Sequence, residues 1–387
     1  MDITIHPQRL TGQVNVIPSK SQAHRLLICA AFADKPTELV CADTNQDIEA
    51  TADCLRSLGA DITRTKSGYT ICPISNIPVT ATLNCCESGS TLRFLLPIVG
   101  ALGVDATFLM EGRLPQRPLS PLWEEMQRMG CSLTRPTGNT IHCTGKLKQG
   151  HYSIDGGVSS QYITGLLFAL SLIGESTLDI TGKIESKPYI YMTQKCMELF
   201  DAPNYRTPGT ITVEGDWSNG AFWLAANALG SDLAIMQLKD NSAQGDRKVA
   251  ELLPKLHRFI TIDVSDIPDL VPILSVVASV NHGATFKNIQ RLRIKESDRV
   301  ASTISMIENL GGKAEATEDT LTIFGTGLQG GIMDACNDHR IAMATAIAAT
   351  ICQQDVTILG AECVKKSYPH FWEEYSRLGG KYEFNLR

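Results

Sequence analysis

A recurring pattern of apolar and polar positions divides the chain into repeats. In each clear copy a stretch with helical periodicity ends in Leu-Gly or Met-Gly, and a short segment of alternating apolar and polar residues follows. Glycine suits the left-handed position that ends a helix because it has no Cβ to clash with the backbone. The clear copies lie at 55–63, 126–133, 307–314 and 375–382, and degenerate copies without the glycine lie at 197–201 and 252–257.

The spacing of these copies predicts the domain organisation. Six helix-stop-strand units follow one another at intervals of roughly 55–70 residues, which is the signature of an internally repeated architecture. At about 100–200 residues per domain, a chain of 387 residues has room for two such groups. The sequence therefore predicts an α/β (α+β) protein with two lobes of three units each.

Several predicted helices begin with small hydroxyl residues. Ser19 precedes the apolar stretch 26–28, Ser88 and Ser90 precede 94–96, and Ser159 and Ser160 precede 166–168. Hydroxyl side chains cap helices by accepting hydrogen bonds from the first free N–H groups. Lysine or arginine residues lie close to two of these starts, at Lys20, Arg25 and Arg93. Free N–H groups, the positive end of a helix dipole and a nearby cation together form an anion site, so the pattern indicates a small anionic ligand with more than one charged group.

Composition removes several classes of protein from consideration. The chain carries 35 Lys and Arg against 41 Asp and Glu, a formal charge of −6, which argues against a nucleic-acid-binding protein. No apolar run is long enough to span a membrane, and the N-terminus lacks the basic and apolar regions of a signal peptide. Twelve cysteines are scattered without a CxxC pair, as expected for reduced thiols and not for a metal site. We therefore expect a cytoplasmic protein with no metal.

Charged residues gather at the predicted element ends of the second half. Asp269 lies at the start of an apolar helix, and Arg340 lies near the start of another. Arg291, Arg293 and Lys295 alternate with apolar residues, which predicts a strand that carries all three cations on one face.

Glu296 and Arg299 are one helical turn apart, and Lys365 and Lys366 precede the last helix. Local positive charge inside an acidic protein indicates a focused site for an acidic ligand. Asp269 and Glu296, together with Lys20, suit proton transfer at a bound anion.

Nine short motifs in colinear order resemble the 5-enolpyruvylshikimate-3-phosphate synthase family. The sequence contains none of the common dinucleotide-binding, P-loop, zincin or serine-hydrolase motifs. The motifs of the resemblance span nearly the whole chain: 18–21, 89–93, 117–118, 159–161, 186–189, 267–269, 295–299, 337–340 and 366–369.

The resemblance implies a fold and a reaction. The fold has two lobes, 18–215 and 1–17 with 216–387, each built from three βαβαββ-type units whose helix N-termini face the interdomain cleft. The reaction transfers the enolpyruvyl group of phosphoenolpyruvate to the 5-hydroxyl of shikimate 3-phosphate, by addition and elimination through a tetrahedral intermediate, and releases phosphate. The resemblance implies no cofactor and no metal, and a monomer that binds small molecules but no nucleic acid or membrane.

The resemblance also assigns roles to individual residues. Asp269 is expected to take the hydroxyl proton, and Glu296 with Lys20 to move the proton at the methylene carbon. The residues implied for phosphoenolpyruvate are Lys20, Gly89, Arg117, Gln161, Arg299, Arg340 and Lys366. The residues implied for shikimate 3-phosphate are Ser21, Arg25, Ser159, Ser160, Gln161, Ser186, Tyr189, Asp269 and Lys295. The first lobe would thus contribute mainly to shikimate 3-phosphate binding, and the second would carry the catalytic carboxylates.

The chain departs from the family pattern in three places. The commoner Asn-Ala-Gly-Thr-Ala is replaced by Glu87-Ser88-Gly89-Ser90-Thr91. Phe94 stands where proline is frequent, and Arg291 stands where some members have asparagine. The nearest alternative is UDP-N-acetylglucosamine 1-carboxyvinyltransferase, which carries a cysteine on the loop that here reads Gly112 to Arg117 without one. An alternative of another class is a non-catalytic anion-binding repeat protein.

Overall fold

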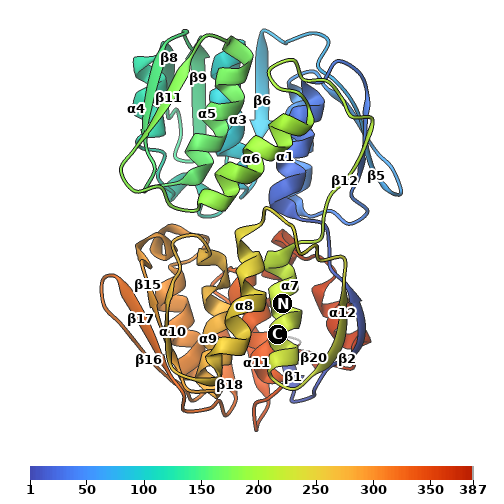
Figure 1. The fold of residues 1–387 in the computed structure, drawn as a ribbon, viewed down its shortest axis with the longest axis vertical. Helices are drawn as coiled ribbons and strands as arrows, with labels where there is room; N and C mark the ends of the chain where they lie inside the picture. The colour runs from blue at the N-terminus through green and yellow to red at the C-terminus, as the bar shows by residue number, and fades with distance from the viewer. Residues whose placement is uncertain (386–387) are drawn as a thin grey trace. The chain divides into compact units, whose positions relative to one another are not determined.

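The protein consists of two compact units. The computed structural model describes residues 1–385. One unit is continuous in sequence, Pro18–Glu214, and the other joins Met1–Ile17 to the chain from Gly215 onward (Figure 1). We refer to them as the continuous unit and the split unit.

The continuous unit alternates strands and helices. Its helices are α1 (Lys20–Ala31), α2 (Gln46–Ser57), α3 (Gly89–Leu102), α4 (Leu122–Arg128), α5 (Ser160–Ile173) and α6 (Lys187–Leu199), with a 3-10 turn η1 (Leu114–Gln116). Its strands are β3 (Thr37–Val40), β4 (Asp61–Arg64), β5 (Gly68–Cys72), β6 (Thr80–Asn84), β7 (Asp105–Leu109), β8 (Cys131–Thr134), β9 (Thr140–Gly145), β10 (His151–Asp155), β11 (Thr177–Thr181) and β12 (Thr210–Thr212).

The split unit has the same alternation and more 3-10 turns. Its helices are α7 (Trp217–Ala228), α8 (Val249–Leu252), α9 (Val271–Val280), α10 (Arg299–Asn309), α11 (His339–Ala349) and α12 (Phe371–Arg377). Its 3-10 turns are η2 (Gly245–Lys248), η3 (Leu253–His257), η4 (Pro268–Leu270), η5 (Gln290–Ile294) and η6 (Ala361–Lys366). Its strands are β1 (Asp2–His6), β2 (Thr11–Asn15), β13 (Asp232–Met236), β14 (Ile260–Asp263), β15 (Ala284–Lys287), β16 (Lys313–Ala316), β17 (Thr320–Phe324), β18 (Gly331–Asp334), β19 (Val356–Leu359) and β20 (Lys381–Asn385).

Four sheets share one topology. In the orders β6-β7-β9-β8 and β14-β15-β17-β16, the first two strands are parallel and the last two form an antiparallel hairpin that folds back onto the second strand. The sheets β12-β3-β5-β4 and β18-β19-β1-β20 have the same order but recruit one strand from far along the chain. Thus β12 supplies the first strand of one sheet, and β1 pairs with β19 and β20 in the other (Figure 1).

The third repeat of each unit is shorter. Within residues 1–385, β10 pairs in parallel with β11 alone, and β2 with β13 alone. These are the repeats whose helices end in the degenerate copies at 197–201 and 252–257, without the Leu-Gly ending. After α6 the chain continues directly to β12, and after η3 directly to β14. Within the described residues, the weak sequence signal therefore corresponds to a repeat with a two-stranded sheet and no terminal hairpin.

The helix-ending glycines have the backbone geometry that the repeat pattern predicts. Gly59, Gly130, Gly311 and Gly379 have φ of +104°, +114°, +86° and +95°, which confirms the prediction. At Gly59 a Cβ would also lie 2.4 Å from the carbonyl oxygen of Asn76. This position therefore combines a positive φ with a close backbone approach, and both require glycine.

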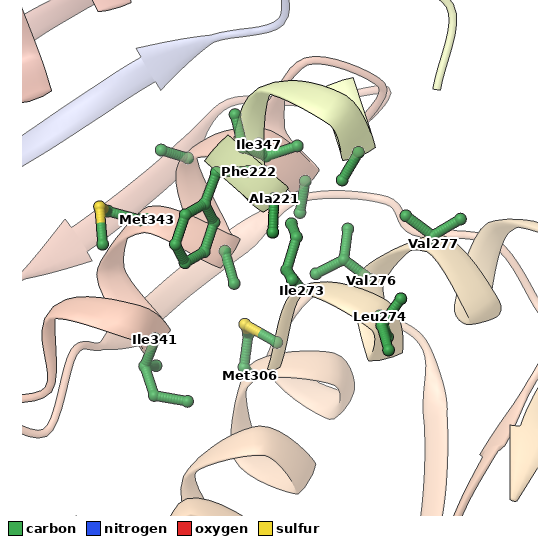
Figure 2. Packing of buried hydrophobic residues seen from close by; sticks show 14 of the residues in the cluster. Ala221, Phe222, Ile273, Leu274, Val276, Val277, Met306, Ile341, Met343 and Ile347 are labelled. Carbon is green, nitrogen blue, oxygen red and sulfur yellow. The ribbon is translucent and has the colours of Figure 1, made fainter. Parts of the chain in front are cut away.

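The central helices of each repeat are buried on nearly all sides. Every residue of α11 is buried, as are nearly all residues of α3 and α9, and a helix apolar on all sides belongs in a core. Figure 2 shows how α7, α9, α10 and α11 interlock in the split unit through Phe222, Ile273, Met306 and Ile347. Because these helices are held on all sides, their N-terminal residues are also held in place.

A substitution at Gly59 tests the role of the repeat glycine. Gly59→Ala should lower the free energy of unfolding by about 1–3 kcal/mol, because alanine is strained at this φ and its Cβ would collide with the Asn76 carbonyl. Urea unfolding measures the change. Gly138→Ala is the matched control, since a Cβ there meets nothing within 4 Å. Equal stability of the two variants would contradict the assignment.

Candidate active site

One turn geometry precedes five of the central helices. In each case the residue that caps the helix lies four positions after the last residue of the preceding strand. These pairs are Asn15 and Ser19, Asn84 and Ser88, Asp155 and Ser159, Thr212 and Asp216, and Asp334 and Asp338. These five helix N-termini therefore follow the carboxyl ends of their strands in the same way.

Side chains at the strand ends build this turn. Asn84, Asp155 and Asp334 each accept a hydrogen bond from the backbone N–H two residues later, at 3.0, 2.6 and 2.7 Å. Asn and Asp favour such turns because their side chains reach their own backbone. The signal is visible in the sequence as an Asn or Asp four residues before the capping residue, and hydroxyl caps alone do not reveal it.

The hydroxyl caps themselves lie where the sequence predicts them. Ser19 accepts from the N–H of Gln22 at 3.4 Å, Ser88 from that of Thr91 at 3.3 Å, and Ser159 from that of Gln161 at 3.3 Å. These bonds confirm the predicted starts of α1, α3 and α5.

The sixth central helix starts differently, and as a result the carboxylate of Asp269 does not serve as a helix cap. After β14 the chain forms the 3-10 turn η4, and α9 begins only at Val271, without a side-chain cap. Asp269 lies inside η4, so its carboxylate is not used to cap the helix and contacts charged side chains of the split unit instead.

Arg299 is the centre of that charged cluster. Its guanidinium is 1% exposed and donates to three carboxylates: to Asp269 at 2.6 Å, to Glu296 at 2.6 Å and to Asp338 at 2.8 Å. Asp338 is fully buried, caps α11 by accepting from the N–H of Arg340, and accepts from the hydroxyl of Ser297. Three chain segments therefore meet at one buried guanidinium.

Asp269 contacts two further cations. Arg340 donates to its second oxygen at 3.1 Å, and Lys295 Nζ lies 3.5 Å from the first. The same Nη2 of Arg340 donates to the hydroxyl of Ser218 at 3.1 Å, and that hydroxyl donates to Asp246.

Lys366 lies close to the start of α11. It donates from Nζ to the carbonyl oxygen of Asn337 at 3.1 Å.

The cations control the ionisation of this cluster. Burial raises the pKa of Asp269, but the charges of Arg340, Lys295 and Arg299 outweigh it and hold that pKa well below its ordinary value. Burial lowers the pKa of Lys295 to about 8, against the opposing effect of Asp269. Burial likewise lowers the pKa of Arg299, but its three carboxylates, Asp338 first, raise it well above the ordinary value.

The predicted strand through Arg291, Arg293 and Lys295 is wrong. Residues 290–294 form the 3-10 turn η5, so these cations do not share a strand face. Arg293 donates to the carbonyl of Thr317 and Lys295 faces Asp269. A period-two pattern over five residues is too short to specify a strand, and of the two intervening apolar residues only Leu292 is buried, while Ile294 is 39% exposed.

In the continuous unit, Gly89, Arg117 and Gln161 meet at the starts of α3 and α5. A Cβ on Gly89 would lie 2.8 Å from Nη1 of Arg117, so only glycine lets that guanidinium approach the helix. Gln161 accepts from Arg93 at 2.7 Å and donates to Ser90 at 2.9 Å. Arg93, which the residue assignments above omit, is 4% exposed and belongs to this group.

Lys20 and Arg25 lie on α1 in different surroundings. Lys20 makes an ion pair with Asp47 of α2 at 2.8 Å. Arg25 is 2% exposed and donates to Ser21, Thr164, Thr193 and the carbonyl of Tyr189. Burial lowers the pKa of Arg25 to about 10. Arg25 thus ties α1 to α5 and α6.

The remaining predicted residues lie at helix starts. Ser160 is the first residue of α5 and is 4% exposed. Ser186 precedes α6 with φ of +55°, and Tyr189 lies in the first turn of that helix. The structure therefore places the predicted residues of the continuous unit at the starts of α1, α3, α5 and α6 and in the turn around η1.

Three simpler properties concern the described part of the chain, residues 1–385. It contains no group of three or more His, Cys, Asp or Glu side chains arranged to hold a metal ion. Its twelve cysteines are free thiols. None of its helices combines the length and the apolar character that crossing a bilayer requires.

The fold is that of the enolpyruvyl transferases. An EPSP synthase from Acinetobacter baumannii matches with a TM-score of 0.80 at 21% identity, covering 100% of both chains. The enolpyruvyl transferase NikO from Streptomyces tendae matches with a TM-score of 0.75 at 16% identity, covering 100% of this chain and 99% of that one.

Sequence comparison identifies the family within this class. The family model described as EPSP synthase (3-phosphoshikimate 1-carboxyvinyltransferase) matches residues 5–262 and 254–375. A 3-phosphoshikimate 1-carboxyvinyltransferase from Clostridium kluyveri is 40% identical, covering 98% of this chain and 97% of its own length. One from Clostridioides difficile is 37% identical, covering 99% of each. The chain belongs to the EPSP synthase family.

Removal of the Asp338 carboxylate tests the buried cluster. Asp338→Ala should lower the free energy of unfolding by about 3–5 kcal/mol, because it leaves Arg299 buried with one carboxylate fewer and α11 without its cap. Asp298→Ala is the matched control, since Asp298 also caps a helix, α10, but is 39% exposed. It should cost about 1 kcal/mol. Chemical denaturation measures both, and equal losses would show that the buried pair contributes nothing beyond the cap.

Proposed function

We propose that this chain transfers the enolpyruvyl group of phosphoenolpyruvate to the 5-hydroxyl of shikimate 3-phosphate, forming 5-enolpyruvylshikimate 3-phosphate and phosphate. This is the carboxyvinyl transfer of the shikimate pathway, which leads to chorismate and the aromatic amino acids. One observation carries the proposal beyond family membership. Asp269 and Glu296, two groups able to transfer protons, share the buried guanidinium of Arg299 and lie beside Lys295 and Arg340.

The residues proposed to bind phosphoenolpyruvate occur in each of the two units. Arg299, Arg340 and Lys366 come from the split unit, where Lys366 bonds to the residue before the cap of Arg340's helix. Lys20, Gly89, Arg117 and Gln161 come from the continuous unit. Phosphoenolpyruvate carries a carboxylate and a phosphate, and arginine guanidinium groups bind both in a bidentate manner.

The proposed shikimate 3-phosphate site uses mostly helix starts of the continuous unit. Its residues are Ser21, Arg25, Ser159, Ser160, Gln161, Ser186, Tyr189, Asp269 and Lys295. N–H groups and hydroxyls at helix N-termini are donors suited to a phosphate and to ring hydroxyls. Buried Arg25 supports this site by holding the backbone of Tyr189 at the start of α6.

The proposed chemistry is addition followed by elimination. Asp269 takes the proton of the 5-hydroxyl, whose oxygen attacks C2 of phosphoenolpyruvate, while C3 receives a proton delivered by Glu296 and Lys20. The tetrahedral intermediate then loses a proton from the new methyl group, and the C2–O bond to phosphate breaks, which restores the double bond. The proton delivered to C3 returns to Glu296 and Lys20 in the elimination, and the hydroxyl proton taken by Asp269 leaves with the released phosphate. Atoms and charge therefore balance, and no redox partner is needed.

The pKa of Asp269 depends on whether the surrounding cations bind Asp269 or a substrate anion. In the structure, Arg299 and Arg340 both donate to this carboxylate, so the pKa of Asp269 is low and the group is a weak base. An anion that draws the two guanidinium groups toward itself reduces their hold on Asp269 and raises its pKa. A general base is most effective when its pKa is near the working pH, so phosphoenolpyruvate itself would activate Asp269.

We further propose that the chain acts as a monomer in the cytoplasm. The twelve free thiols of the described residues, most of them buried, suit a reducing compartment. Sedimentation analysis of the purified protein reports the oligomeric state.

Phosphate release with two acceptors tests the reaction. We expect release with phosphoenolpyruvate and shikimate 3-phosphate together, and none when UDP-N-acetylglucosamine replaces shikimate 3-phosphate. The opposite preference would establish the alternative carboxyvinyltransferase. Binding of phosphoenolpyruvate without turnover on either acceptor would instead support an anion-binding repeat protein.

Conservative substitutions test the two carboxylates. Asp269→Asn and Glu296→Gln should each lower kcat by about 10²–10⁴-fold with a smaller effect on KM, because both retain the side-chain shape but lose the proton-transfer group. Steady-state phosphate release measures both constants. Glu318→Gln changes an exposed glutamate and should leave kcat unchanged. Turnover that survives both changes would show that other groups move the protons.

A further inference from the structure

One buried carboxyl group of the split unit has no role in the proposed reaction. Asp246 lies in η2 and is 2% exposed. One of its oxygens accepts from the hydroxyl of Ser218, and within residues 1–385 the other oxygen has no hydrogen-bond partner. Buried ionised carboxylates normally accept several hydrogen bonds or contact a cation directly. The surroundings of Asp246 therefore suit a neutral carboxylic acid better than a carboxylate.

Asp246 is connected to the anion site through one hydroxyl. Ser218 donates to Asp246 and accepts from Nη2 of Arg340, and the same nitrogen donates to Asp269. Gln244 fixes this arrangement, because it accepts from the N–H of Trp217 at 3.0 Å and donates to the carbonyl of Gly215 at 2.8 Å. The segment that carries Asp246 is thereby attached to the start of α7, which carries Ser218.

The balance of charges in the cluster favours protonation of one carboxyl group. Four carboxyl groups, Asp246, Asp269, Glu296 and Asp338, accompany three cations, Lys295, Arg299 and Arg340. Full ionisation gives these seven groups one excess negative charge before an anionic substrate arrives. Three of the carboxylates bond directly to Arg299, whereas within residues 1–385 Asp246 is connected to a cation through the hydroxyl of Ser218 and not by a direct ion pair. Asp246 is therefore the group on which a proton costs least.

The electrostatic environment agrees with this assignment. Burial, together with the charges of Asp269 from η4 and of Asp216, which caps α7, raises the pKa of Asp246 to about 7. Arg340 from α11 and the hydrogen bond from Ser218 act in the opposite direction. An anion that engages Arg340 offsets the charge of that guanidinium and so favours the protonated form further.

We propose that Asp246 is a positioning residue of the anion site that must be protonated when phosphoenolpyruvate engages Arg340. Molecules in which Asp246 is ionised take up a solvent proton upon binding and return it when the anion leaves. Only an O–H bond on Asp246 forms and breaks. The proton keeps a buried negative charge away from the incoming anion, while Ser218 continues to hold the guanidinium. The inference rests on the proposed function, because it assigns phosphoenolpyruvate to Arg340.

The pH dependence of KM for phosphoenolpyruvate tests this inference. Asp246→Asn is neutral at every pH and should have a KM close to that of the unmodified protein at pH 6. By pH 9 the unmodified protein should have a KM at least about tenfold higher than Asp246→Asn, because it must then protonate Asp246 upon binding. Ionisation of the substrate affects both proteins equally and cancels in the ratio.

Control substitutions separate the effect from a general disturbance. Asp240→Asn removes an exposed carboxylate close to η2 and should keep the pH dependence of the unmodified protein. Ser218→Ala should raise KM more than kcat falls, because Arg340 loses its support. Ser275→Ala also removes a buried hydroxyl, but one that, unlike the hydroxyl of Ser218, has no hydrogen-bond partner in the described chain. It should change neither constant. A KM ratio between the unmodified protein and Asp246→Asn that stays constant from pH 6 to pH 9 would overturn the proposal.

A stability measurement is independent of turnover. The folded pKa of Asp246 lies above the ordinary aspartate value, so the stability contributed by this group is lost as pH rises from about 4 to about 7. Asp246→Asn avoids that loss and should raise the unfolding temperature more at pH 8 than at pH 5. If this difference appears but no acceptor supports phosphate release, the proposed reaction fails and the protonation of Asp246 stands. If turnover occurs but the difference is absent, the inference about Asp246 is wrong.

Discussion

The buried guanidinium of Arg299 is the interaction on which the organisation of the split unit depends. It binds Asp269 from η4, Glu296 from the turn before α10, and Asp338 from the cap of α11. Burying these charges is costly unless all of them are paired with good geometry. The pairing therefore requires the starts of α9, α10 and α11 to lie together, and the apolar core beneath them supplies the rigidity that keeps them there (Figure 2).

The start of α9, beside this cluster, differs from the turn that precedes the other central helices. Five central helices each have a capping residue four positions after the last residue of the preceding strand, and its side chain accepts from the first N–H groups. The helix α9 lacks such a cap, and Asp269 lies in the 3-10 turn that replaces it. In our proposal, the regular helix starts supply donors for an anion, and the one irregular start makes the carboxylate of Asp269 available for proton transfer.

The cations and the carboxylates of the cluster stabilise each other's charged forms. Arg299, Arg340 and Lys295 keep Asp269 ionised, and in return the carboxylates keep Arg299 firmly charged despite its burial. Asp246 has no ion pair within residues 1–385, and burial raises its pKa to about 7. We propose that its protonation balances the remaining charge. In our proposal, an arriving anion redistributes the same contacts. It makes Asp269 a stronger base and favours the uptake of a solvent proton by Asp246.

The sequence by itself determined the repeats, the helix-ending glycines and the hydroxyl caps, because these depend on local backbone geometry and on patterns a few residues long. It also pointed to Asp269, Glu296, Arg299 and Arg340 through motifs. Only the tertiary structure decided that residues 290–294 form a 3-10 turn, that the third repeats lack a hairpin, and that Ser218 and Asp246 join the cluster. The physical reason is that Ser218, Asp246 and Arg340 are far apart in the chain, and their contacts depend on how the buried helices pack together.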